Sequence, residues 1–329
     1  MSTALTYQDV VNQTDEEYAA DWRAWHEARE AQLDSEYGWL SLRSIDWLTD
    51  GQTITIPKFP GSWTQHGDTV TYTPEAGKPV TNRGQVITEP KDIEVTAHAD
   101  VNVEDFDYEG VRAQLIKRIG ASRQFAVRQR DPNSATRRSF HGVPHFPLDR
   151  SWVLPAHYEP LAEWKNSETG AVLGDLSHNE TIIGYVTFTK DGKDYRLAVF
   201  QGHNDDSGWT KVDPETGKTV YLDNRQDTDG HGFALFRDQT SGKETYGGAR
   251  GLGFDVSDPS AITYVDFNRA TNLPCSFTLY CTCPFAPAEN FLPFEVRAGE
   301  TTPTIVHEND LTDADAAESE SATDDALAA

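Results

Sequence analysis

The chain has 329 residues, enough for one large domain or two ordinary ones. Its 53 Asp and Glu residues outnumber its 28 Lys and Arg residues, and the formal net charge is −25. This charge argues against nucleic acid and anionic membranes as partners, because both bind proteins through basic patches. Hydrophobic residues make up 37% of the chain, too many for an intrinsically disordered protein.

The charged residues also point to an environment. Lysine is scarce, with 10 residues against 18 arginines. Carboxylates hold water and cations while adding little apolar surface, so an acid-rich, lysine-poor chain predicts a salt-adapted (halophilic) protein with an acidic surface. The alternative is an acidic protein from an organism without adaptation to high salt. The first residues lack the basic start and apolar run of a secretory signal, and we expect a cytoplasmic protein.

The predicted elements begin with a short N-terminal extension over residues 1–13 and a helix over 14–34. Thr14 and Glu17 have the spacing of a capping box, which marks a helix start. An apolar stripe then follows at helical spacing: Tyr18, Trp22, Trp25 and Leu33. We expect this amphipathic helix to pack its stripe on the rest of the protein.

From residue 51 the hydrophobic period changes to two, which predicts a single β-rich domain over residues 35–307. Candidate strands are 52–56, 69–73, 93–97, 112–117, 124–128, 152–158, 182–189, 194–201, 233–236, 262–268, 276–280 and 294–297. Asp191-Gly192 predicts a type I′ hairpin turn. Many short strands at this spacing favour a mainly β fold, an antiparallel barrel or sandwich with the N-terminal helix packed on it.

Two acidic segments stand apart from this pattern. Residues 202–231 are polar and rich in Asp, and we interpret them as a long loop or an insertion of unassigned role. Residues 308–329 carry eight acids and no Lys or Arg, and we expect a disordered acidic tail.

The sequence contains no dinucleotide-binding Gly-x-Gly-x-x-Gly, no Gly-x-Ser-x-Gly and no His-Glu-x-x-His. We therefore expect no cofactor. All three cysteines lie between Cys275 and Cys283, and an odd count of this kind fits free thiols in a reducing compartment. A metal site is a weak alternative, with Cys275 and Cys283 as ligands. His141 and His145 are four residues apart, but Gly142 and Pro144 argue against the helix that would pair them.

A group of hydrogen-bonding residues near the end of the domain forms the candidate site. Short or aromatic polar side chains predominate in it, unlike the Lys and Glu of a solvated face. We expect Tyr264, Asp266 and Asn268 to share one face of a strand. The ligand-binding candidates are Tyr246, Arg250, Asp266, Asn268, Asp238, Thr240, Cys275 and Glu300.

Our leading hypothesis is a small-molecule binding protein in which Arg250 holds an anionic ligand by paired hydrogen bonds. This requires that Arg250 and Asp266 converge in one cavity. The structural alternative is a buried network that supports a turn around Arg250.

Two other function classes stay open. One is an enzyme, with Asp266 or Glu300 as a general base or with Cys275 as a nucleophile. The other is a structural or interaction protein without a ligand. The oligomeric state cannot be read from the sequence.

Several segments together resemble the domain of unknown function 1684 family of bacterial and archaeal proteins. They are Tyr37-Gly-Trp-Leu-Ser-Leu42 with Trp47-Leu48 and Gly51, Phe236–Tyr246 with Arg250, Asp266-Phe-Asn268, Asn272–Cys275, Cys283-Pro284, Asn290-Phe-Leu292 and Ala298-Gly-Glu300. The resemblance covers about residues 15–300. It implies no catalytic role, because the activity of the family is unassigned. Cys281, His141 and His145 fall outside the family's pattern, which weakens a three-thiolate zinc site.

Overall fold

The computed structural model describes residues 5–96, 100–121, 124–202, 210–212, 219–221 and 230–304. The acidic tail predicted over 308–329 lies outside the described residues, as does most of the segment 202–231. Within that segment two short strands, β15 (Thr210–Val212) and β16 (Thr219–Tyr221), pair with each other.

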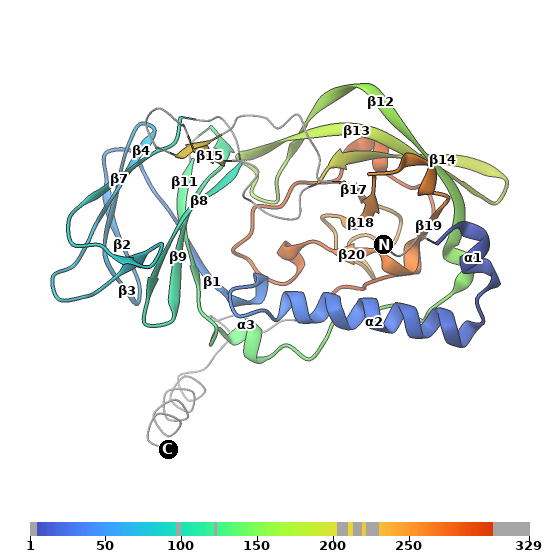
Figure 1. The fold of residues 1–329 in the computed structure, drawn as a ribbon, viewed down its shortest axis with the longest axis horizontal. Coiled ribbons are helices and arrows are strands. Elements are labelled where there is room, and N and C mark those ends of the chain that lie inside the picture. The colour runs from blue at the N-terminus through green and yellow to red at the C-terminus, as the bar shows by residue number, and fades with distance from the viewer. Residues whose placement is uncertain are drawn as a thin grey trace, which may run out of the picture.

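The prediction of a mainly β fold is confirmed. The strands pair antiparallel in several sheets that stack like a sandwich, and the described sheets do not close into a barrel. The molecule has two β-rich halves, and the long helix α2 runs along one side of it (Figure 1).

The first half packs a six-stranded sheet against a four-stranded sheet. In spatial order the larger sheet contains β1 (Leu42–Trp47), β11 (Phe125–Arg130), β9 (Val111–Lys117), β8 (Val101–Tyr108), β5 (Thr81–Asn82) and β6 (Gln85–Val86). The smaller sheet contains β2 (Thr53–Ile56), β3 (Phe59–His66), β4 (Thr69–Thr73) and β7 (Lys91–Glu94). Trp63, Tyr72 and Phe106 form an aromatic cluster in the shared core, with ring centroids 4.8–4.9 Å apart.

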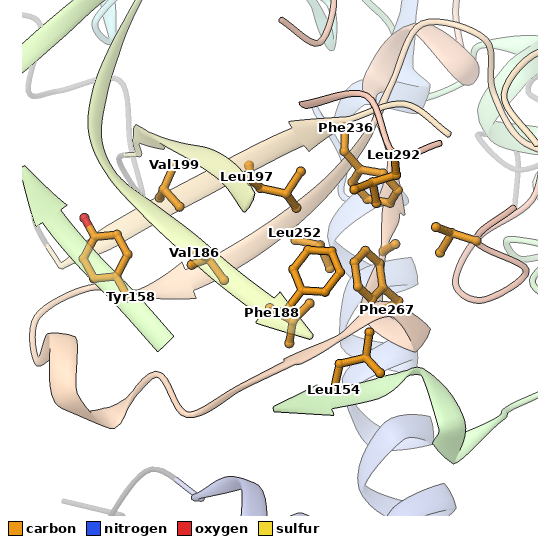
Figure 2. Packing of buried hydrophobic residues seen from close by; sticks show 14 of the residues in the cluster. Leu154, Tyr158, Val186, Phe188, Leu197, Val199, Phe236, Leu252, Phe267 and Leu292 are labelled. Carbon is orange, nitrogen blue, oxygen red and sulfur yellow. The ribbon is translucent and has the colours of Figure 1, made fainter. Parts of the chain in front are cut away.

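The second half is built on one large sheet. Its strands are, in spatial order, β19 (Tyr264–Asp266), β12 (Val153–Gly170), β13 (Leu176–Lys190), β14 (Lys193–Gln201), β17 (His231–Phe236), β18 (Arg250–Asp255) and β20 (Thr271–Asn272). Its core includes Phe188, Phe236 and Phe267, whose rings pack edge to face (Figure 2). The short strand β10 (Ile119–Gly120) follows β9 in the chain. It pairs with β13 of the large sheet and so links the two halves.

The hairpin between β13 and β14 confirms the predicted turn. Asp191 and Gly192 have φ values of 51° and 73°, so both central residues adopt the left-handed conformation that a type I′ turn requires. Lys190 pairs with Lys193 directly across the turn.

The predicted N-terminal helix is α2 (Asp15–Leu33), and a shorter helix, α1 (Tyr7–Asn12), precedes it. The capping box is present: the Thr14 amide donates to Glu17 Oε2 at 2.8 Å, and the Glu17 amide donates to Thr14 Oγ1 at 3.2 Å. Tyr18 and Trp22 are buried as expected. Trp25 is only half-buried and lies 5.4 Å from the guanidinium of Arg269.

Among the described residues, the remaining elements are one short helix, α3 (Ala135–Arg138), and single turns of 3₁₀-helix. These turns are η1 (Trp39–Ser41), η2 (Arg150–Trp152), η4 (Pro259–Ala261), η5 (Phe267–Arg269), η6 (Pro274–Ser276) and η7 (Ala288–Asn290). No helix among the described residues has the length and apolar character needed to cross a membrane.

Two predicted strands are wrong. Residues 276–280 follow the turn η6, where the Phe277 amide donates to the carbonyl of Pro274 at 2.9 Å. Residues 294–297 form no regular secondary structure, and the carbonyl of Val296 accepts a hydrogen bond from Arg250 at 2.8 Å. A buried side chain thus replaces a neighbouring strand there.

Candidate functional site

Arg250, the centre of the predicted site, starts strand β18 and is 1% exposed. Its guanidinium forms an ion pair with Asp238 at 2.6 Å and also donates to the carbonyls of Val296 and Ala298. Burial lowers the pKa of Arg250, although the nearby carboxylate of Asp238 opposes that shift. The guanidinium therefore fastens the 296–300 segment to the sheet, which favours the structural alternative.

Asp238 and Thr240 belong to the same network. One oxygen of Asp238 accepts hydrogen bonds from the amide and hydroxyl of Thr240, and the Thr240 hydroxyl lies 2.8 Å from that of Thr245. Asp238 thus connects a tight turn to Arg250. These bonds hold the backbone of residues 238–245 in place.

Asp266 and Asn268 dock helix α2 onto the second half. The Asp266 carboxylate accepts hydrogen bonds at 3.0 Å from the hydroxyl of Tyr18 and from the backbone and side-chain amides of Asn268. Burial raises the pKa of Asp266. Strand β19 ends at Asp266, so Asn268 lies in η5 and not on the strand face that we predicted. There its amide group pairs with both backbone groups of Asp149.

Glu300 is also engaged in docking α2. It is 1% exposed and accepts hydrogen bonds from Arg29 Nε at 3.3 Å and from the Asn272 amide. Burial raises its pKa. The side chains of Asp266 and Glu300 hold the helix, whereas that of Arg250 holds the turn around Asp238 and the 296–300 segment. Arg250 Nη1 lies 3.4 Å from the carbonyl of Glu300, so these structural networks meet at that residue.

A cavity of about 610 Å³ lies elsewhere, between the two halves. Strands β8, β11, β13 and β17, the end of α2 and the 273–284 segment all contribute to its wall. Its lining includes Trp39, Arg128, His178, Glu180, Leu235 and Cys283. Arg250, Asp266, Asn268 and Tyr246 do not line it. A cavity of this size between two packed units is a common location for a small-molecule site.

Three arginines gather at this cavity. Arg128 and Arg130 alternate along β11 and so share its cavity-facing side, while Arg118 directly follows β9. Arg118 donates to the carbonyls of Val101 and Lys117, and Arg130 donates to those of Tyr37 and Gly38.

Arg128 differs from the other two. It is 1% exposed, and its Nη2 donates to the Thr282 hydroxyl at 3.2 Å. Its Nε and Nη1 have no hydrogen-bond partner among the described residues. Burial, reinforced by the positive charge of Arg118, lowers the pKa of Arg128 to about 9. At neutral pH the site therefore holds a buried cation with two donor nitrogens unused among the described residues.

The opposite wall carries a histidine and two carboxyls. His178 and Glu180 alternate on β13, and His178 Nδ1 lies 2.9 Å from Asp100. Burial opposes the charged imidazole, but the hydrogen bond and charge of Asp100, the charge of Glu180 and the hydrogen bond to the Thr282 backbone together outweigh it and raise the pKa of His178. Burial raises the pKa of Glu180 to about 7, against the opposing effect of His178. Titratable side chains that line a cavity and have shifted pKa values are typical of functional sites.

Two of the three cysteines, Cys281 and Cys283, line the cavity. Hydrogen bonding with Cys275 and Cys281, together with burial, raises the pKa of Cys283. Burial is the main reason why the pKa of Tyr246 is raised, and Cys275 adds to the effect. In the described part of the chain no group of three or more His, Cys, Asp or Glu side chains is arranged to hold a metal ion.

Sequence reasoning missed the arginines, His178 and Glu180. A signal was present in Phe125–Arg130, where two arginines alternate with residues of a buried strand. Every residue of this strand is buried, so the charges of Arg128 and Arg130 require either a hydrogen-bonding partner in the protein or a bound ligand.

The family match covers most of the second half. Residues 138–301 match the model of a family described as "Protein of unknown function (DUF1684)", a shorter range than the 15–300 that the resemblance suggested. No curated protein matches the chain.

The chain is also similar to a solution NMR structure of the uncharacterized protein from gene locus rrnAC0354 of Haloarcula marismortui. The identity is 22% and the TM-score 0.36, over 50% of this chain and 79% of that one. This likeness is too low to support an argument about fold or function. The second half of this chain is thus similar to the DUF1684 family, over a range that contains His178, Glu180 and the three cysteines but not the cavity's arginines.

Proposed function

We propose that this protein binds a small organic anion, bearing a carboxylate or phosphate group, in the cavity between its two halves. The observation that carries the proposal is the state of Arg128, a buried cation whose Nε and Nη1 are unpaired among the described residues. Burying a charge without a partner costs several kcal/mol. An anion that accepts a charge-assisted hydrogen bond from either nitrogen would offset that cost.

The rest of the lining suggests the body of the ligand. Trp39, Phe233 and Leu235 provide apolar surface. The guanidinium groups of Arg128 and Arg130 lie 5.8 Å and 5.2 Å from the Trp39 ring. We expect an amphipathic anion, with its charged end at Arg128 and an apolar part against these side chains.

Isothermal titration calorimetry tests this proposal with inorganic phosphate and phenyl phosphate as probes, in constant KCl. Phenyl phosphate is expected to bind more tightly than inorganic phosphate, because its ring buries apolar surface. Arg128→Met is expected to weaken binding at least about tenfold, since charge-assisted hydrogen bonds contribute about 1.5–3 kcal/mol. Arg23→Gln, at an exposed position on α2, is the control and is expected to bind normally. Equal binding by Arg128→Met would contradict the proposal.

An enzyme is the second candidate, and Glu180 favours it. A carboxyl group that titrates near pH 7 beside an anion site suits a general acid or base. If the bound anion is transformed, the rate is expected to follow a group with a pKa of about 7 and to be lost in Glu180→Gln. A rate independent of Glu180 would leave binding as the function.

We also propose that the protein works in a salt-rich solution. The net charge of −25 supports this, because carboxylates repel one another at low salt, where the Debye length reaches about 30 Å at 0.01 M.

A further inference from the structure

The cavity between the two halves carries charges of both signs, and the anion proposal uses only one of them. Arg128 on β11 has two donor nitrogens that are unpaired among the described residues. Glu180 on β13 lines the opposite wall and forms no ion pair within the described ranges. We propose that the ligand is a small zwitterion, with its acid group at Arg128 and a protonated amino group at Glu180. This inference rests on the anion-binding function and names the class of the ligand.

The other two titratable side chains of this wall neutralise each other. His178 Nδ1 lies 2.9 Å from an oxygen of Asp100, and His178 Nε2 contacts the carbonyl of Thr282. Carboxylate and carbonyl oxygens only accept hydrogen bonds, so both ring nitrogens donate and the imidazole is a cation. The second oxygen of Asp100 accepts a hydrogen bond from the Ile119 amide at 3.2 Å. Asp100 is therefore fully used, and Glu180 is the carboxyl that can receive a cation.

Thr282 connects the two charged walls. Its hydroxyl accepts a hydrogen bond from Arg128 Nη2 at 3.2 Å, and its carbonyl accepts one from His178 Nε2. The guanidinium and the imidazole thus contact the same residue. Glu180 lies two positions beyond His178 on β13, about 7 Å along the strand and on the same face. An amino acid or a short amino-substituted acid has the length to reach from Arg128 to Glu180.

An anion without an amino group satisfies only Arg128. It also brings a negative charge into the cavity that holds the Glu180 carboxyl, and like charges in a buried site repel each other. A protonated amino group removes this repulsion, because it donates hydrogen bonds to the ionised carboxyl. The pKa of Glu180 is about 7, so such a cation keeps this carboxyl ionised at neutral pH. Trp39 and Leu235 line the same cavity and provide apolar surface for the carbon chain or ring of the ligand.

Isothermal titration calorimetry at neutral pH and constant KCl tests this inference with two pairs of carboxylates. In each pair an aminomethyl group replaces an ethyl group of similar size: γ-aminobutyrate is compared with pentanoate, and para-(aminomethyl)benzoate with para-ethylbenzoate. A merely apolar pocket prefers the ethyl compound, because burying an ammonium group without a partner is costly. Pairing with Glu180 predicts the opposite order. We expect the amino compound to bind at least about tenfold more tightly in the pair whose length fits the cavity.

Glu180→Gln is the informative variant, because it removes the charge and keeps the size of the side chain. We expect the preference for the amino compound to disappear in this variant. Glu168→Gln is the matched control, since Glu168 is exposed on the neighbouring strand β12, and we expect it to keep the preference. Each variant is first compared with the wild type by circular dichroism and melting temperature.

Two results would overturn the inference. One is equal or tighter binding of the ethyl compound in both pairs, and the other is a preference for the amino compound that persists in Glu180→Gln. If the ethyl compounds bind and Arg128→Met abolishes this binding, the anion site stands even when the zwitterion is refuted. If none of the four carboxylates binds, or if Arg128→Met binds them like the wild type, the anion proposal has failed as well.

Discussion

Replacing Arg128 by methionine tests the central feature of the cavity. Each pKa unit is worth about 1.4 kcal/mol, so a pKa lowered to about 9 means that holding this side chain charged in the ligand-free site costs about 5 kcal/mol. Methionine has a similar length and no charge. It forfeits the hydrogen bond to Thr282, worth about 1 kcal/mol. We therefore expect the ligand-free variant to be more stable than the wild type by about 1–3 kcal/mol.

The assay is urea unfolding at fixed KCl without phosphate, followed by tryptophan fluorescence. Arg118→Met is the matched control, because Arg118 lies at the same cavity but donates to the carbonyls of Val101 and Lys117. Those acceptors would lose their partner, and we expect this variant to be destabilised by about 2–3 kcal/mol. If Arg128→Met were destabilised as much as Arg118→Met, Arg128 would be a satisfied structural residue and the reasoning would fail.

Three further predictions concern other charged groups. Because the pKa of Glu180 is raised to about 7 in the folded protein, the stability that its neutral form provides is present below the unfolded pKa and is lost as the pH rises through 7. Glu180→Gln is thus expected to match the wild type near its unfolded pKa and to exceed it by up to about 3 kcal/mol at pH 8; equal pH profiles would contradict this. Asp238→Ala leaves the cation of Arg250 buried without its partner, and we expect a loss of about 3–5 kcal/mol in urea unfolding, whereas a loss below about 1 kcal/mol would show that the pair is dispensable. The melting temperature is expected to rise from low to molar KCl, and a constant value would refute salt adaptation.

The sequence predicted the local features of the fold well. The capping box at Thr14 and the hairpin at Asp191-Gly192 both form, because each depends on a few neighbouring residues. The strand expected over 294–297 does not form, because the conformation there depends on residues far away in the sequence. Its backbone is held by Arg250, a residue more than forty positions earlier, and no local pattern reports such a contact.

The same limit applies to the candidate site. Clustering in the sequence suggested that the polar residues around Arg250 bind a ligand, but Asp238 and neighbouring carbonyls use the donors of its two terminal nitrogens. Arg128 and Glu180 come from separate strands, β11 and β13, and meet only because the two halves pack together.

A crystal structure of the protein grown with phenyl phosphate tests the anion site most directly. The account predicts that the phosphate group lies within hydrogen-bond distance of Arg128 Nε or Nη1, with the phenyl ring against Trp39 and Leu235. A cavity without ligand, in which a carboxylate of the protein itself binds Arg128, would contradict it.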